Sequence, residues 1–164
     1  AASAEPSASA NEELDAELET IVARLVPELL AESGVGPVCA AQLVVSSGDP
    51  TRMRNEASFA ALAGTSPVQA SSGQTQRHRL NRGGDRRLNR ALHVITLHRV
   101  RWHPEIAAYY RRLQDNGKTP REARRCVKRQ LARYFHQTKD ITRTHLDTIE
   151  ASTHQMEAAS PRCL

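Results

Sequence analysis

Residues 85–102, "DRRLNRALHVITLHRVRW", combine a helix start with apolar residues spaced for one buried face. That spacing, in steps of three and four residues, predicts an amphipathic helix, and Asp85 is a suitable N-cap for it. His103-Pro104 interrupts the pattern, so we expect the helix to end at about Trp102. The apolar residues on the predicted face are Leu88, Ala91, Leu92 and Ile95, with Leu97 as its least regular member.

Two more helices are predicted after this one. Pro104 suits the first turn of a helix over "PEIAAYYRRLQDN", and Gly117 would end that helix. Thr119-Pro120-Arg121-Glu122 then forms a capping box with proline at the first helical position. The helix that follows this box carries its apolar residues four apart, at Ala123, Val127, Leu131 and Phe135.

The N-terminal part of the chain is acidic. Residues 1–10, "AASAEPSASA", lack core-forming side chains and are expected to be a disordered leader. Residues 11–33 predict an acidic amphipathic helix that Pro27 interrupts. Such a helix packs on its own domain or makes a coiled-coil contact with another chain or domain. Its apolar seam is too short to distinguish these two arrangements. The seam residues are Leu14, Leu18, Ile21, Val22, Leu25 and Leu29.

Short helices are predicted in the middle of the chain, one starting near Pro37 and one over "EASFAALAG", which Gly64 would end. Residues 65–84 hold few large apolar side chains and are typical of an exposed loop or loose hairpin. No strand-like alternation of any length occurs, so the predicted fold class is mainly α. Periodicity fades after about Lys139, and residues 140–164 are expected to be a tail.

Charge is unevenly distributed along the 164 residues. Residues 77–143 contain 19 Lys and Arg against five Asp and Glu, whereas the rest of the chain contains four basic and 13 acidic residues. A basic body with an acidic N-terminal segment indicates a polyanionic partner, most commonly nucleic acid. A solvated helical surface is the alternative explanation.

Several other classes of protein fit the sequence poorly. No apolar run approaches the length of a membrane span, and the first residues lack the features of a signal peptide. Cys39, Cys126 and Cys163 have neither an even count nor zinc-ligand spacing, so no metal site is predicted and a reducing cytoplasm is expected. His93 and His98 are five residues apart, which does not place them on one helix face as a metal pair.

The exposed loop and the helix after it hold the densest group of arginines. Guanidinium groups bind phosphate oxygens in pairs and stay charged at any cellular pH, so this group suits a nucleic-acid backbone. Asn81 and Asn89 are candidates for further hydrogen bonds to the same backbone. The candidate DNA-binding arginines are Arg77, Arg79, Arg82, Arg86, Arg87 and Arg90.

A second candidate phosphate contact is Gly34-Val35-Gly36, directly before the helix that starts near Pro37. Free N–H groups and the positive end of the helix dipole favour an anion at such a position, and glycine lets the backbone come close to it. The helix-hairpin-helix motif binds nucleic-acid backbone in this way. An ordinary turn between two helices is the alternative.

Ser71-Ser72-Gly73 lies in the arginine-rich loop and contains the candidate nucleophile. A serine hydroxyl is a weak nucleophile unless a base or a positioned charge activates it. Gly73 leaves the hydroxyl approachable, and nearby arginines could neutralise the charge that develops on an attacked phosphate. Tyr109 and Tyr110 are less favoured as nucleophiles, because a helix would place at least one of them in the core.

The order of these motifs resembles the C-terminal domain of a bacterial insertion-sequence transposase family. The resemblance covers about residues 20–137 and rests on Gly-Val-Gly, Ala-Gly-Thr-Ser-Pro, Ser-Ser-Gly, Arg-Gly-Gly-Asp and Arg-Arg-Leu, in that order. Members join an N-terminal ribonuclease-H-like domain, which bears a DEDD carboxylate set, to a C-terminal serine domain, and some are guided by a bridge RNA. Many relatives have Lys-Arg-Gly-Asn where this chain has Arg82-Gly83-Gly84-Asp85.

The resemblance implies roles that local chemistry leaves open. It identifies Ser72 as the nucleophile of a transposase or recombinase and implies DNA binding by Gly34, Gly36, Gly73 and the arginines that follow. Residues 34–139 would be the DNA-binding transposase domain, and residues 11–33 an acidic linker or coiled-coil helix.

The resemblance also implies partners and a cofactor. The partners are DNA, a guide RNA in some members and a second copy of the full-length protein, with no membrane. Magnesium is expected in the DEDD domain, and since no such domain precedes residue 1 we expect the chain to be a fragment. A non-catalytic nucleic-acid-binding remnant or module is the alternative.

Overall fold

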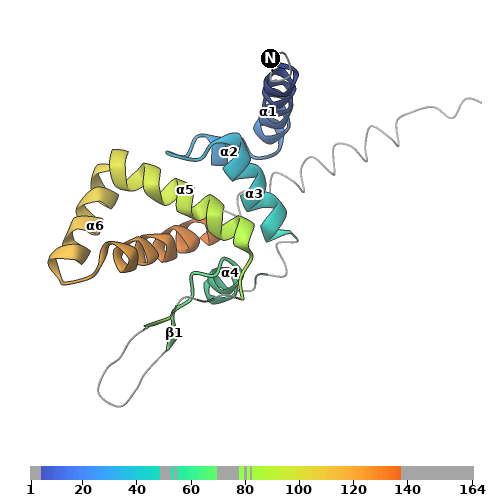
Figure 1. Cartoon of the computed structure of the whole chain (residues 1–164). Coiled ribbons are helices and arrows are strands. Elements are labelled where there is room, and N and C mark those ends of the chain that lie inside the picture. The colour runs from blue at the N-terminus through green and yellow to red at the C-terminus, as the bar shows by residue number, and fades with distance from the viewer. Residues whose placement is uncertain are drawn as a thin grey trace, which may run out of the picture.

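The computed structural model describes residues 5–48, 53, 55–69, 78–79, 81 and 83–137. These residues are mainly helical, which confirms the predicted fold class (Figure 1). The helices are α1 (Glu5–Leu25), α2 (Pro27–Leu30), α3 (Pro37–Ser47), α4 (Glu56–Leu62), α5 (Arg86–Trp102) and α6 (Pro104–Asp115). The chain is helical again over residues 120–137, and we refer to this element as the 120–137 helix.

Helix α5 is the central element and has the predicted start. The Asp85 carboxylate accepts hydrogen bonds from the backbone N–H of Arg87, at 2.7 Å, and of Leu88, at 3.2 Å. The buried residues of α5 recur every three or four positions: Leu88, Ala91, Leu92, Ile95, Thr96 and Arg99. The same period carries Leu97 out of the buried face, where it is 45% exposed.

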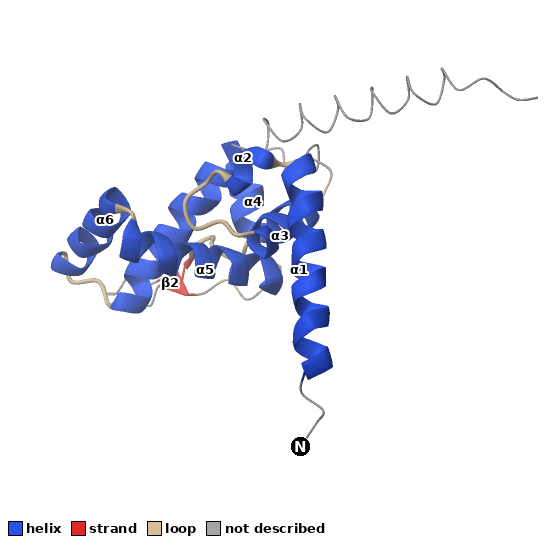
Figure 2. Ribbon diagram, turned by 90° about the horizontal axis from the view of Figure 1, so that it is seen from above, coloured by secondary structure: helices blue, strands red, loops and turns tan. Residues whose placement is uncertain are grey.

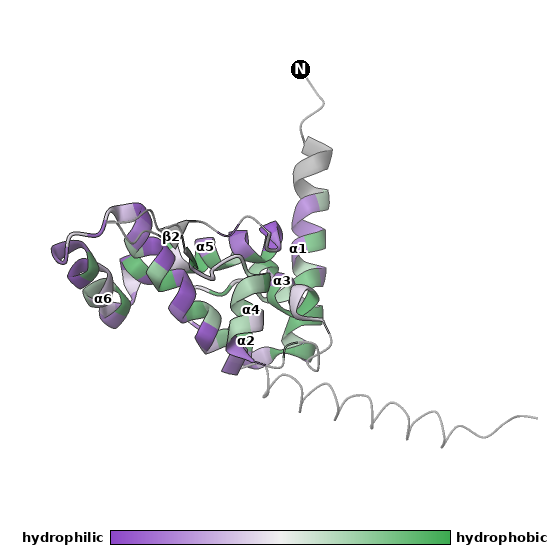
Figure 3. Ribbon diagram, turned by 90° about the horizontal axis from the view of Figure 1, so that it is seen from below, coloured by the Kyte–Doolittle hydropathy of each residue, from purple (hydrophilic) through white to green (hydrophobic). Residues whose placement is uncertain are grey.

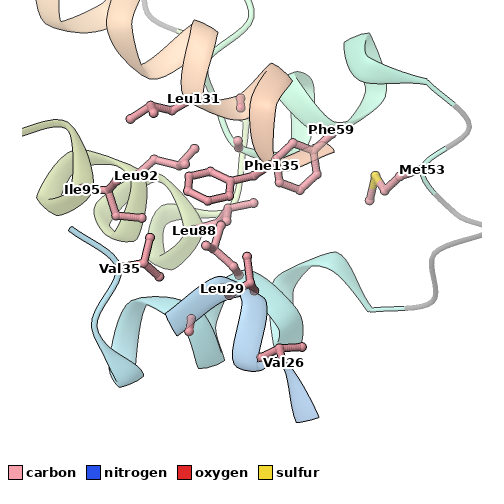
Figure 4. Close-up of a cluster of buried hydrophobic side chains, with 14 of the residues drawn as sticks. Val26, Leu29, Val35, Met53, Phe59, Leu88, Leu92, Ile95, Leu131 and Phe135 are labelled. Carbon is pink, nitrogen blue, oxygen red and sulfur yellow. The ribbon is translucent and has the colours of Figure 1, made fainter. Parts of the chain in front are cut away.

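The core surrounds α5 on two sides (Figure 4). Leu29 of α2 and Val35 of the following turn approach from one side, and Phe59 of α4 and Phe135 of the 120–137 helix approach from the other. Burying a Leu or Phe side chain of this kind contributes about 1.5–3 kcal/mol. Helix α5 is therefore the element through which the two halves of the core are joined.

The C-terminal helices begin as predicted. Pro104 occupies the first turn of α6, and Gly117 follows that helix with a φ of +80°. In the capping box, Glu122 accepts a hydrogen bond from the Thr119 hydroxyl at 2.7 Å and from the Thr119 N–H at 2.9 Å. The 120–137 helix then runs back alongside α5, and its predicted core residues Ala123, Val127, Leu131 and Phe135 are all buried (Figure 1).

Helix α1 begins at Glu5 and so includes residues 5–10 of the segment that we expected to be a disordered leader. Proline is tolerated in the first turn of a helix, and the alanines that follow Pro6 favour helix. The interruption at Pro27 is as predicted. The last turns of α1 carry Val22 into the core, whereas its N-terminal part extends away from the body (Figure 2).

The arginine-rich loop is a hairpin at its base. Strands β1 (Val68–Gln69) and β2 (His78–Arg79) pair antiparallel, with Val68 opposite Arg79. Between the two alternatives of a loop and a loose hairpin, the structure therefore selects the hairpin. Residues 70–77, at its tip, lie outside the described residues.

The helices differ in the hydropathy of their residues. Helices α5 and α6 alternate between hydrophilic and hydrophobic residues along their length, while α3 and α4 are mostly hydrophobic (Figure 3). Among the described residues, no helix is both long and apolar enough to cross a membrane. The division of the chain at residues 33/34 and 139/140 stays a prediction.

Candidate nucleic-acid interface

The hairpin leaves the body at a contact between two backbone segments. A Cβ atom on Gly84 would lie 2.4 Å from the backbone nitrogen of Gly64 and 2.6 Å from the carbonyl oxygen of Leu62. The N–H of Asp85 donates to that same carbonyl oxygen at 2.6 Å. The end of α4 and the start of α5 thus meet backbone to backbone, and only glycine fits at Gly84.

Asp85 follows Gly84 directly and makes a second contact between elements. Besides capping α5, its carboxylate accepts a hydrogen bond from the Ser46 hydroxyl of α3 at 2.6 Å. This bond is the main cause that lowers the pKa of Asp85; the N–H groups of Leu88 and Arg87 also lower it, and burial opposes them. The Asp85 carboxylate therefore has partners within the fold, and its hydrogen bond with Ser46 joins α3 to α5.

Replacing Asp85 with alanine is expected to destabilise the chain by about 1–2 kcal/mol at neutral pH, the usual cost of a lost N-cap. Because the folded-state pKa of Asp85 is lowered, its contribution is present above the ordinary carboxyl pKa and disappears as the pH falls through the lowered value. Urea unfolding of both proteins from neutral to acidic pH measures this. A difference in unfolding free energy that does not shrink on acidification would contradict the prediction, and Asp115→Ala, at an exposed site, is the control.

Asn81 and Asn89, which we expected to add hydrogen bonds to phosphate, are used inside the fold. The Asn89 side chain donates to the carbonyl oxygen of Ala63 at 2.6 Å and accepts from the Lys128 ammonium at 2.9 Å. The Asn81 side chain donates to Ala61 at 3.3 Å and accepts from the Gly83 N–H at 2.9 Å. Each amide therefore already makes two hydrogen bonds that hold the base of the hairpin, and a further hydrogen bond from its second N–H to phosphate stays a prediction.

Three of the predicted arginines lie on the first turns of α5. Arg86, Arg87 and Arg90 are exposed, and they take part in none of the ion pairs between described residues. Cations at the N-terminus of a helix meet the positive end of its dipole, so their presence there is unfavourable for folding. Their position favours a role in binding an anion over a role in stability.

The structure describes only one of the other predicted site residues of the loop. Arg79 belongs to β2, so the chain brings it to the base of the hairpin from which α5 starts. The remaining candidates, Ser72, Gly73, Arg77 and Arg82, lie outside the described residues, as does Ser71. Their roles stay predictions.

The two glycines before α3 have different surroundings. Gly34 has a φ of +78°, which favours glycine, and a Cβ atom there would also lie 2.6 Å from Nδ1 of His98 on α5, so the fold itself accounts for this glycine. Gly36 is the N-cap of α3, and no atom lies within 4 Å of the place where its Cβ would be. Of the two, only Gly36 leaves its backbone open to a ligand.

A buried arginine that was not predicted from the sequence holds this turn. Arg99 of α5 is buried and donates to the carbonyl oxygen of Ser33 at 2.8 Å and to the Glu32 carboxylate at 2.7 Å. Its guanidinium lies over the ring of Tyr134, whose hydroxyl also donates to Glu32. The one hint in the sequence is that Arg99 falls on the buried stripe of α5, four residues after Ile95.

The remaining candidates for chemistry are placed as expected. Tyr109 and Tyr110 are both half-buried and pack against the core. Within the part of the chain that the structure describes, no group of three or more His, Cys, Asp and Glu could hold a metal ion. The packing of both tyrosines therefore does not favour a tyrosine nucleophile.

Comparison with known proteins places the chain in a family. Residues 27–111 match the family described as "Transposase IS116/IS110/IS902 family". The "Insertion element IS110 uncharacterized 43.6 kDa protein" of Streptomyces coelicolor is 33% identical over 120 residues, which are 72% of this chain and 30% of that relative. The chain thus spans about a third of the length of that relative. The family match covers 85 of the 164 residues, including the glycine turn, the hairpin and α5, and the chain belongs to the Transposase IS116/IS110/IS902 family.

Proposed function

We propose that this chain is the DNA-binding part of an insertion-sequence transposase and that Ser72 is the nucleophile for strand cleavage and rejoining. The observation that carries the proposal is the group of exposed arginines on α5, Arg86, Arg87 and Arg90, at the base of the hairpin. Their guanidinium groups take part in none of the ion pairs between described residues, and family membership makes DNA the expected polyanion. Gly36, at the open N-terminus of α3, is a second proposed phosphate contact.

The proposed reaction is a direct attack on the DNA backbone. The hydroxyl oxygen of Ser72 forms a bond to phosphorus while the bond from phosphorus to one DNA oxygen breaks, and the proton that Ser72 loses is balanced by the one that the released DNA oxygen takes up to become a hydroxyl. The phosphoserine link keeps the free energy of the broken bond available for rejoining. The arginines of the hairpin and α5 would stabilise the added charge on the phosphate.

The metal-dependent part of the chemistry is proposed to belong to another domain. By the family resemblance, magnesium would be held by the DEDD carboxylates of a ribonuclease-H-like domain, and a guide RNA and oligomer formation would involve the full-length protein. We therefore expect this chain alone to bind DNA without efficient recombination. A covalent DNA adduct at Ser72 formed by the chain on its own would contradict this.

The DNA-binding surface can be tested by the salt dependence of binding. Replacing Arg86 and Arg90 with glutamine is expected to reduce the slope of log affinity against log salt by about 1.8, because each lost phosphate contact removes about 0.9. The double variant of Arg111 and Arg112, which are exposed on α6, removes the same charge and is the control. Fluorescence anisotropy with a labelled DNA duplex measures both slopes, and equal losses in the two variants would contradict the proposed surface.

The alternative function, a non-catalytic nucleic-acid-binding module, predicts a different effect of replacing Ser72. In the full-length transposase, Ser72→Ala is expected to abolish strand exchange and leave DNA affinity unchanged. Strand exchange in a recombination assay and affinity by anisotropy would be measured on the same preparation. If the domain only binds DNA, the substitution will change neither.

A further inference from the structure

Lys128 is a buried cation without an ion-pair partner in the described part of the chain. Its side chain lies on the 120–137 helix, is 9% exposed, and donates to the Asn89 side chain at 2.9 Å. The ion pairs between described residues belong to Arg99, Arg129 and Arg133 instead. An ammonium that leaves water for a single neutral partner loses hydration that the fold does not replace.

Other basic groups lie around Lys128. Burial lowers the pKa of Lys128, and the charge of Arg125 lowers it further. On α5, burial lowers the pKa of His93, and the charges of Lys128 and Arg124 lower it further. Arg124 and Arg125 precede Lys128 by four and three residues on one helix, and His93 follows Asn89 by four residues on α5. Residues at this spacing share a helix face, and the hydrogen bond from Lys128 to Asn89 joins the two faces, so the four basic groups lie where α5 meets the 120–137 helix. We refer to Lys128, Arg124, Arg125 and His93 as the Lys128 cluster.

The Lys128 cluster lies beside the base of the hairpin. Asn89, which accepts the hydrogen bond from Lys128, also donates to Ala63 at the end of α4. The next residue on the helix, Arg129, contacts the Ser66 hydroxyl at 3.4 Å, shortly before β1 begins. His93 follows Arg90 by one helical turn on α5, so the cluster continues the exposed arginines toward the 120–137 helix.

We propose that the Lys128 cluster is a binding site for a backbone phosphate of DNA, separate from the arginines of the hairpin and of the first turn of α5. A phosphate there would supply the negative charge that the described surroundings of Lys128 lack. Its oxygens would accept the two N–H groups that Lys128 does not donate to Asn89, together with those of a neighbouring guanidinium. The inference rests on the proposed function in one respect only, that the phosphate belongs to DNA.

The site itself can be tested without DNA, using inorganic phosphate as the probe. Phosphate is expected to raise the midpoint of thermal unfolding of the native chain by about 3 °C over sodium chloride at equal ionic strength, and the rise should saturate. Lys128→Met should show a smaller rise. Lys118→Met removes the same charge from an exposed position outside the cluster and should behave like the native chain, and it also accounts for the general effect of phosphate on folding.

Arg125→Gln keeps the hydrogen bond from Lys128 to Asn89 and covers the case in which Lys128→Met fails to fold. It should also show a smaller rise than the native chain. An equal rise in the native chain and all three variants would overturn the site, because Lys128 would then serve only to hold Asn89.

Duplex DNA supplies the second measurement. The slope of log affinity against log salt is expected to fall by about 0.9 more in Lys128→Met and Arg125→Gln than in Lys118→Met. If the native chain binds phosphate at the cluster but no DNA, the site stands and the proposed function is wrong. If DNA binds with the same slope in every variant and phosphate gives equal shifts, the proposed function stands and the site is wrong.

Discussion

Replacing Gly84 with alanine is expected to lower the free energy of unfolding by about 3 kcal/mol, at the upper end of the usual cost of overpacking. The added Cβ would lie 2.4 Å from the backbone nitrogen of Gly64, 2.6 Å from its Cα and 2.6 Å from the carbonyl oxygen of Leu62. All three atoms belong to backbone, so no side chain can rotate to make room. The substitution must separate α4 from the start of α5, and with it the hydrogen bond from the Asp85 N–H to Leu62.

Gly83→Ala is the matched control, because Gly83 is the exposed neighbour of Gly84 in the same turn. A Cβ atom on Gly83 would lie 3.4 Å from the Asn81 side chain, which is ordinary contact, and we expect a change within about 0.5 kcal/mol. Urea unfolding followed by circular dichroism measures both variants. If Gly84→Ala is as stable as Gly83→Ala, the backbone contact at the base of the hairpin is not present as described.

The helices were predictable because the residues that define them are close together in the sequence. The cap at Asp85, the buried stripe of α5 and the box at Thr119–Glu122 each depend on side chains within a few positions of one another. Periodicity and capping report such local interactions. The start of α1 was less predictable, since a polar segment rich in alanine and serine can be helical or not without a strong pattern.

The structure around the candidate site depends on pairs that are far apart in the sequence. Asp85 accepts from Ser46, which is 39 positions away, and Lys128 donates to Asn89, also 39 positions away. Such pairs leave no periodic trace in a single sequence, so the amide of Asn89 looked available for phosphate. Composition correctly indicated an excess of arginine near the hairpin, but it could not distinguish Arg86, which is exposed, from Arg99, which is buried.

Replacing Arg99 with methionine is the other change with a large expected effect, a loss of about 3 kcal/mol in unfolding free energy. The Arg99 and Glu32 side chains are 7% and 25% exposed, so their ion pair is mostly shielded from water. Methionine keeps the packing of the arginine stem but leaves the Ser33 carbonyl without its 2.8 Å hydrogen bond and Glu32 without its cation. Breaking one partner of a buried ion pair costs about 3–5 kcal/mol, and the partial exposure of Glu32 places this case at the lower end.

The loss of stability is expected to appear first as local opening of the turn that leads to Gly36 and α3, because Arg99 joins that turn to α5. Hydrogen exchange is expected to accelerate at the Val35 N–H, which donates to the backbone carbonyl oxygen of Glu32 within the turn, before it does so in α5. Arg101→Met removes the same charge two positions later, where the arginine is exposed and stacks on Trp102, and should cost no more than about 0.5 kcal/mol. Equal stability of the two methionine variants would mean that Arg99 does not hold the turn.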